Sequence, residues 1–238
     1  MTPDLPPLPA CCTPLDYHWP LPWPMPGAQL LRTRFDPSRL APDDFERQGI
    51  PPARGVAKRQ SEYLAGRVCA RGALHRLTGE IQVPAVGTDG APQWPQAVVG
   101  SITHGAGWAA AVVAHSGDYQ GLGLDLEQVL SSERAERLAE QILTPAELQR
   151  LHKLESERRA LLVTLTFSFK ESLFKALYPL VKTRFYFEDA ELLAWSPEGR
   201  ARLRLLTDLS PAWPAGRELD GQFGQFDGCL LSLISVPV

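Results

Sequence analysis

The chain has 238 residues, of which 44% are hydrophobic, so it can bury a real core as one large domain or as two halves. This composition excludes a largely disordered chain. The net charge of −3 argues against nonspecific binding to nucleic acid, because a phosphate backbone normally requires a basic surface.

The first segment, Met1–Pro26, contains nine prolines. Proline's fixed φ and missing N–H exclude a helix or a central strand there, so we expect an extended arm. A solvated linker is one alternative, but the Leu, Trp and Tyr residues between the prolines favour an arm that packs on the domain surface.

Nothing in the sequence predicts export or membrane insertion. The arm has neither the basic start nor the apolar stretch of a secretory signal, and no later apolar run is long enough to span a bilayer. The cysteines lack metal-ligand spacing, which predicts reduced thiols without disulfides; they are Cys11, Cys12, Cys69 and Cys229. We therefore expect a cytoplasmic protein with no nucleic-acid or membrane partner.

Periodicity and breaker residues predict a mixed α and β chain. The expected helices are Ala57–Leu77, Ser132–Glu140, Pro145–Lys153, and Glu157–Leu177 ending before Pro179. The expected strands are Ala97–His104 and Trp108–Ala114, joined as an antiparallel hairpin, then Tyr119–Val129, Lys182–Trp195, Ala201–Leu206 and Gly228–Val236.

Two carboxylates share one face of the third predicted strand. Leucines alternate with Gly121, Gly123, Asp125 and Glu127, so both acids point away from the leucine face and can lean onto one cation. Ordinary surface acids are the alternative for this pair. Glycines inside a strand often mark a place where a ligand or another backbone approaches closely, which favours a site.

The run Phe167–Lys175 places Glu171 between Lys170 and Lys175. Two structural interpretations compete with a site: a surface ion pair between Glu171 and Lys175, and a capping box from Ser168 to Glu171. If the phenylalanines anchor the segment, the acid and both lysines are left to face a common ligand. One acid between two bases suits a metal bound to a phosphate.

Four further side chains are candidates for contacts with an anion. His104 ends a strand at a glycine turn with Ser101 nearby, although a lone histidine is more often structural. Arg59 and Arg67 are rotated by roughly 80° on a helix, so both can reach one side, and arginine forks match phosphate oxygens. A solvated basic face is the alternative for this helix.

Four ordered blocks carry a family resemblance: Lys58–Arg67, Gly100–His104, Gly123–Glu127 and Phe167–Lys175. On them the chain resembles the 4'-phosphopantetheinyl transferases, in particular the enterobactin synthetase component D and surfactin-type branch, and the broad-specificity carrier protein synthases of bacteria. One difference is the loop before Trp94, where many relatives carry a base and this chain has none.

The resemblance implies an α+β fold of two similar halves related by a pseudo-two-fold axis, with coenzyme A in the cleft between them. Residues 1–120 would contribute the proline-rich arm and contacts to coenzyme A phosphates, and residues 121–238 the metal site and the carrier-protein dock. Because the two halves would complete one cleft, we expect a monomer.

The resemblance also assigns residue roles. Asp125, Glu127 and Glu171 match carboxylates that hold Mg²⁺ on the diphosphate. The positions that match contacts to coenzyme A phosphates are Arg59, Arg67, His104, Lys170 and Lys175, with Ser101 beside them. Glu147 matches a further acid near the site.

The implied reaction is transfer of the phosphopantetheine arm of coenzyme A to a serine of apo acyl carrier and peptidyl carrier proteins. Glu171 is the leading general base, with Glu147 or a metal-bound water as competitors, and Lys175 would offset charge on the leaving phosphate. Two other functions stay open: a metal-dependent phosphohydrolase, and a binding module without turnover.

Overall fold

The computed structural model describes residues 5–238, apart from the side chain of residue 157. The chain divides into two compact units. The first contains residues 5–19, Met25–Tyr119 and Val238, and the second contains Pro20–Pro24 and Gln120–Pro237. In the described part of the chain, no helix combines the length and apolar character needed to cross a bilayer.

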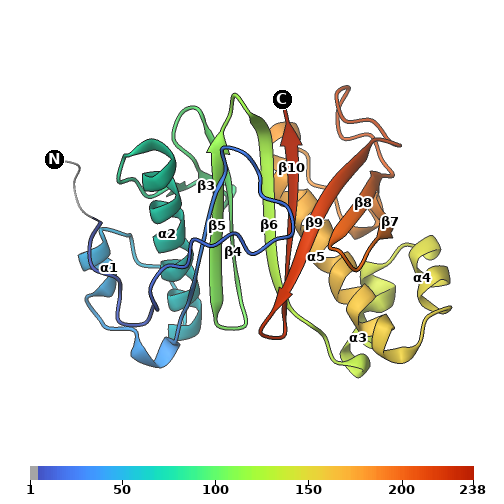
Figure 1. Ribbon diagram of the computed structural model, residues 1–238, viewed down its shortest axis with the longest axis horizontal. Coiled ribbons are helices and arrows are strands. Elements are labelled where there is room, and N and C mark those ends of the chain that lie inside the picture. Colours follow the sequence, from blue (N-terminus) through green and yellow to red (C-terminus); the bar gives the residue numbers. More distant parts are fainter. Residues whose placement is uncertain (1–4) are drawn as a thin grey trace. The chain divides into compact units, whose positions relative to one another are not determined.

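The first unit packs one long helix on a three-stranded antiparallel sheet (Figure 1). The sheet has the order β1-β5-β4, with β1 at Gln29–Arg34, β5 at Trp108–His115 and β4 at Val98–Gly105. Helix α2 spans Ala57–Thr78 and ends at Gly79, whose φ of 80° is the left-handed conformation typical of a helix end. The shorter elements are η1 (Pro37–Arg39), α1 (Asp44–Gln48), β2 (Ala85–Val86) and β3 (Pro92–Gln93).

The predicted helix and hairpin of this unit are confirmed. In the hairpin, Gly105 pairs with Trp108, and the two residues between them, Ala106 and Gly107, have φ of 50° and 78°. Positive φ at both central residues gives a two-residue turn whose twist matches that of the strands. Strand β1 was not predicted, because the basic residues within it hide the apolar alternation.

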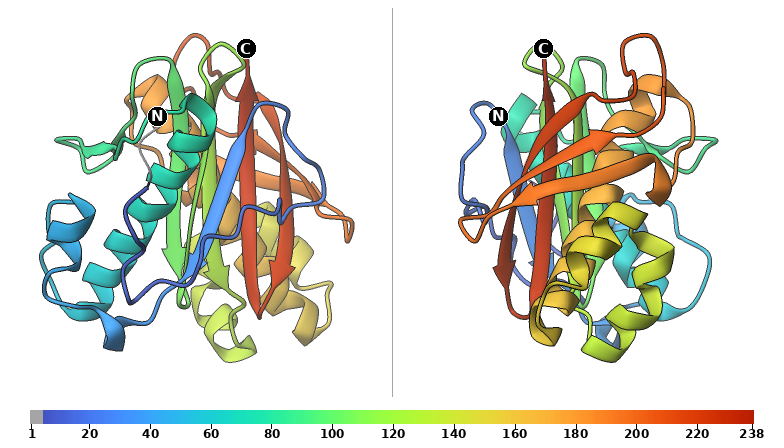
Figure 2. Two further views of the ribbon diagram at one scale, coloured as in Figure 1. Left: turned by 60° about the vertical axis from the view of Figure 1, so that its left-hand side comes forward. Right: turned by 90° about the vertical axis from the view of Figure 1, so that its right-hand side faces the viewer.

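In the second unit, helices cover one face of a five-stranded antiparallel sheet (Figure 2). The strand order is β6 (Tyr119–Gln128), β10 (Cys229–Pro237), β9 (Glu218–Phe226), β8 (Arg200–Leu205) and β7 (Ala190–Trp195). Helix α5 spans Ser156–Val181, and the other helices are α3 (Ser132–Ile142), α4 (Pro145–Leu151) and η2 (Phe187–Asp189). The core lies between α5 and the sheet and includes Leu165, Phe169, Leu173, Leu203 and Ile234.

Three predictions for this unit need correction. Helix α5 continues through Pro179 to Val181, because this proline lies in the last turns and the buried Ala176 and Leu177 hold that part of the helix on the core. Only Ala190–Trp195 of the predicted strand Lys182–Trp195 is a strand. Strand β9 was missed, because its glycines and polar residues have low strand propensity.

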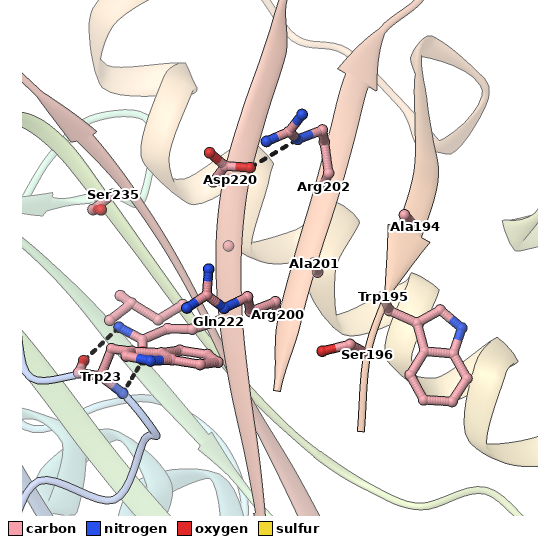
Figure 3. A pocket seen from close by; sticks show the side chains of 12 residues that line it. Trp23, Ala194, Trp195, Ser196, Arg200, Ala201, Arg202, Asp220, Gln222 and Ser235 are labelled. Carbon is pink, nitrogen blue, oxygen red and sulfur yellow. Dashed lines mark hydrogen bonds and ion pairs between the residues drawn. The ribbon is translucent and has the colours of Figure 1, made fainter. Parts of the chain in front are cut away.

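The expectation of an extended, packed arm is confirmed over residues 5–26. Cys12 and Asp16 form isolated bridges with Phe35 and Arg32 of the first unit. Trp23 belongs to the second unit, where its N–H donates to Gln222 Oε1 at 3.0 Å and its carbonyl accepts from Gln222 Nε2 at 2.9 Å (Figure 3). Residues 1–4 of the predicted arm lie outside the described residues.

Candidate active site

The two glycines of β6 allow helix α5 to lie directly on this strand. A Cβ on Gly123 would overlap the carbonyl oxygen of Ser172, and a Cβ on Gly121 would overlap that of Ala176. The close approach marked by these glycines is therefore that of another backbone. It brings α5 beside the strand just before Asp125, so residues from the two motifs meet.

Asp125 lies at the centre of this meeting point. Its side chain is 6% exposed, and its Oδ1 accepts a hydrogen bond from Lys175 Nζ at 2.7 Å. Lys175 Nζ also donates to the Leu124 carbonyl at 3.1 Å. The other carboxylate oxygen, Oδ2, is buried and has no hydrogen-bond partner within the described residues. A buried acceptor without a partner is costly, so Oδ2 is suited to a ligand that is positively charged.

The other two acids are electrostatically coupled to Asp125. Burial, followed by the charge of Asp125, raises the pKa of Glu127 to about 7, while Lys175 opposes this shift. Burial and Asp125 also raise the pKa of Glu171. Each carboxylate therefore feels the charge of its neighbours in a poorly solvated place, where a cation would favour the ionised forms.

The donor chemistry of these carboxylates fits Mg²⁺, which prefers oxygen ligands. Among the described residues, no three His, Cys, Asp or Glu side chains already stand as a set of metal ligands. The ammonium of Lys175 instead provides the positive charge beside Asp125. That the three acids hold one cation therefore stays a prediction, which the unpartnered Oδ2 supports.

The surroundings of Lys170 differ from those that the sequence predicted. Its side chain is 2% exposed, and Nζ donates to Glu147 Oε2 at 2.7 Å and to the carbonyls of Ile142 and Phe187, both at 2.8 Å. These bonds use all three ammonium protons, and burial lowers the pKa of the group. Lys170 therefore joins parts of the second unit internally, although it also lines a cavity beside Glu171. A contact of Lys170 with coenzyme A stays a prediction.

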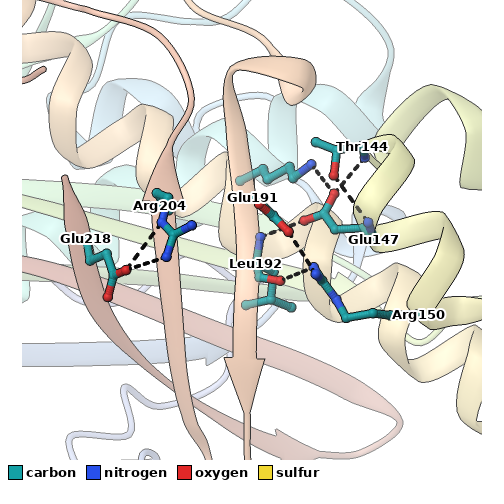
Figure 4. Close-up of polar contacts among 8 residues, drawn as sticks. Thr144, Glu147, Arg150, Glu191, Leu192, Arg204 and Glu218 are labelled. Atoms are coloured by element: carbon teal, nitrogen blue, oxygen red, sulfur yellow. Dashed lines mark hydrogen bonds and ion pairs between the residues drawn. The ribbon is translucent and has the colours of Figure 1, made fainter. Parts of the chain in front are cut away.

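Glu147 is likewise an interior residue rather than a competitor for the general base (Figure 4). It closes a capping box at the start of α4, where it accepts from the Thr144 N–H at 2.7 Å. Its other oxygen accepts from the Leu192 N–H of β7 at 2.6 Å. With Lys170 as the third donor, this buried carboxylate is held by internal hydrogen bonds on both of its oxygens, which favours a structural role over that of a general base.

The alternative of a capping box at Ser168 is also wrong. Ser168 lies in the middle of α5, and its hydroxyl hydrogen-bonds that of Ser232 on β10 at 2.7 Å. Lys175 pairs with Asp125 across elements, which gives it a role beyond a helix-surface ion pair with Glu171.

The four candidates for anion contacts in the first unit differ from one another in burial. Arg59 is exposed on α2, whereas Arg67 is buried, and its guanidinium donates to the Pro84 carbonyl at 2.7 Å and lies over the Tyr63 ring. Ser101 is buried on β4. His104, at the exposed end of β4, has Nδ1 3.9 Å from Glu62 Oε2. Contacts of these residues with coenzyme A stay predictions.

Sequence reasoning missed an aromatic cavity beside Glu171. It has a volume of about 190 Å³ and is lined by Phe174 of α5 and by the segment after this helix, including Arg184, Phe185, Tyr186 and Phe187. The aromatic run Phe185–Phe187 is visible in the sequence, but it was interpreted as part of the predicted strand Lys182–Trp195 and not as the lining of a cavity. The cavity places apolar surface next to one of the three acids.

Comparison with known proteins identifies the class. A model of the 4'-phosphopantetheinyl transferase N-terminal domain matches residues 45–114, and a model of the 4'-phosphopantetheinyl transferase superfamily matches residues 121–225. The chain belongs to the 4'-phosphopantetheinyl transferase family and is a transferase of the holo-carrier-protein synthase type. The resemblance drawn from the four motifs is confirmed, as is the α+β fold class.

Several relatives match along most of their length. The chain is 37% identical over 205 residues to 4'-phosphopantetheinyl transferase Svp of Streptomyces mobaraensis, covering 82% of each chain. It is 36% identical over 179 residues to enterobactin synthase component D of Escherichia coli, covering 74% of this chain and 82% of the relative. It is 34% identical over 214 residues to 4'-phosphopantetheinyl transferase PptT of Mycobacterium tuberculosis, covering 84% and 88%.

Proposed function

We propose that this transferase uses Mg²⁺ to move the phosphopantetheine arm of coenzyme A onto a serine of apo acyl carrier and peptidyl carrier proteins, releasing adenosine 3',5'-bisphosphate. The observation that carries the proposal is Asp125 Oδ2, a buried oxygen without a partner among the described residues, beside Lys175 and coupled to two further acids.

In the proposed reaction, the serine oxygen bonds to the β-phosphorus of coenzyme A, and the bond from this phosphorus to the bridging oxygen of the diphosphate breaks. Asp125, Glu127 and Glu171 would hold the Mg²⁺, which would supply neutralisation of diphosphate charge. The ammonium of Lys175 offsets charge on the leaving phosphate. In this proposal the serine proton goes to Glu171, although a bound cation would bring the raised pKa of this carboxyl back down.

The test incubates the full chain with coenzyme A, Mg²⁺ and an apo carrier protein, and weighs the carrier by mass spectrometry. A carrier that gains the arm supports the proposal. Cleavage of coenzyme A without modification of the carrier would indicate a hydrolase, and neither reaction would indicate a binding module.

Two variants then separate the roles of the acids. Asp125→Asn is expected to abolish transfer and to weaken Mn²⁺ binding measured by electron paramagnetic resonance, whereas Glu133→Gln on the exposed face of α3 should change neither. Glu171→Gln is expected to lower the rate by about 10² to 10⁴ with Mn²⁺ affinity retained if Glu171 is the base. Loss of Mn²⁺ affinity would show that Glu171 is chiefly a ligand, and near-normal transfer by Asp125→Asn would contradict the metal assignment.

A further inference from the structure

A second cavity lies in the second unit, on the face of the sheet turned away from α5. Its volume is about 480 Å³, which is within the range that small ligands occupy. On β8, Ala201 and Leu203 point into the core beneath α5, so their neighbours Arg200 and Arg202 point to the opposite face. None of the three acids of the active site lines this cavity.

Two rows of side chains that run across the strands form the floor. Arg202 faces Asp220 in one row, and Arg200 faces Gln222 in the other, with Gln222 opposite Leu233 of β10. Small residues at the ends of the rows, Ala194, Ser196 and Ser235, leave space above the sheet.

Trp23 of the proline-rich arm forms one wall (Figure 3). Its backbone is fixed by both hydrogen bonds to Gln222. The neighbouring Pro22 lies against Gly199, where a Cβ would come within 2.7 Å of the Pro22 ring. The guanidinium of Arg200 stacks over the Trp23 ring at 4.5 Å from its centroid, so a flat cation is held against a flat apolar ring.

The charges of the two rows do not balance. Arg202 Nε donates to Asp220 Oδ1 at 2.9 Å, which neutralises that row. Arg200 faces the neutral Gln222, whose amide already binds the arm, and no carboxylate lining the cavity pairs with it. Glu198, whose carboxylate feels the charge of Arg200, is exposed and lies outside the lining. Among the side chains that line the cavity, Arg200 and Arg202 outnumber Asp220, so the lining itself has an excess of positive charge beside an aromatic wall. Glu218, 3.8 Å from Arg202, lies outside this lining.

We propose that this cavity binds a small organic anion with a flat ring, an aromatic carboxylate being the chemical class. The guanidinium edge of Arg200 offers parallel N–H donors to a carboxylate, and its planar surface together with Trp23 provides a platform for a ring. Leu233 and Ala194 supply apolar floor. The site goes beyond the transferase reaction, because its lining shares no residue with the carboxylate site.

The test titrates the full-length protein with naphthoate by isothermal titration calorimetry. Arg200→Gln should weaken binding at least about tenfold, the cost expected for loss of a charged hydrogen bond. Arg204→Gln is the matched control, because Arg204 lies four residues further along the same strand face and does not line the cavity. Its partner Glu218 also lies 3.8 Å from Arg202. This control variant should bind naphthoate as the wild type does.

Further probes test the anion and the ring separately. Naphthamide, which lacks the charge, and inorganic phosphate, which lacks the ring, should each bind at least about tenfold more weakly than naphthoate. Coenzyme A should not displace naphthoate. Absence of saturable naphthoate binding, equal loss in Arg204→Gln, equal binding of phosphate, or displacement by coenzyme A would overturn the proposal.

Discussion

Lys170 and Lys175 lie on one helix in the same motif, yet the structure gives them opposite surroundings. Lys175 is partly exposed beside Asp125, and Lys170 is buried against Glu147. The spacing of five residues rotates them by roughly 140° around the helix, so they cannot face one ligand equally. Their chemistry could be predicted from sequence, but which of them meets the acids depends on how α5 is rotated on the sheet.

The Glu147 and Lys170 pair is expected to be essential for stability. Glu147→Gln should lower the free energy of unfolding by about 3 kcal/mol or more, because it leaves a buried ammonium without its counter-charge. Glu218→Gln, which removes the exposed partner of Arg204 in the same view (Figure 4), should cost less than about 1 kcal/mol. Urea unfolding of both variants measures these changes. A similar loss of unfolding free energy in the two variants would contradict a structural role for Glu147.

At the scale of elements, the meeting of β6 and α5 decides where the site is. The alternation that places Asp125 and Glu127 on one strand face was readable from sequence, as were α2 and the hairpin of β4 and β5. The continuation of α5 through Pro179 was not readable, because packing of Ala176 and Leu177 outweighs the local preference against proline.

Gly123→Ala tests whether the glycine contact positions the acids. The added methyl would overlap the Ser172 carbonyl, so α5 must shift, at an expected cost of about 3 kcal/mol or more. The shift should also weaken Mn²⁺ binding, because it moves Glu171 from Asp125. Gly117→Ala, where a methyl meets nothing within 4 Å, should change stability by less than about 1 kcal/mol. Thermal unfolding and Mn²⁺ titration give the two readouts. If Gly123→Ala has the stability and the Mn²⁺ affinity of the wild type, the close contact of Gly123 with α5 does not position the acids.

At the scale of the whole molecule, contacts distant in sequence complete the second unit. Trp23 and Gln222 are 199 residues apart and hold the arm on β9. Strand β6 begins this unit's main segment, and β10 ends it, in one sheet. The cavity beneath Trp23 was therefore invisible in the sequence, where its lining is spread over both ends of the chain.

Stability should depend on pH through Glu127. Its pKa is about 7 in the folded protein and near the ordinary 4.5 when unfolded, so between these values the unfolded chain releases a proton that the folded protein keeps. Stability therefore falls as pH rises through this window. Without divalent cations, Glu127→Gln should melt at a higher temperature than the wild type near pH 8, and the difference should shrink toward pH 4. Scanning calorimetry with a chelator measures this, and a constant difference would contradict the raised pKa.

By itself, the sequence determined the family, the α+β class, most helices and strands, and the acids and lysines of the motifs, because these follow from local periodicity and from residue types at fixed spacing. Only the tertiary structure decided which charged groups are partners. Lys170 was assigned to the interior, Lys175 to Asp125, and Arg200 to Trp23, because burial and long-range packing set the solvation of a charge, and neither is encoded in any short segment.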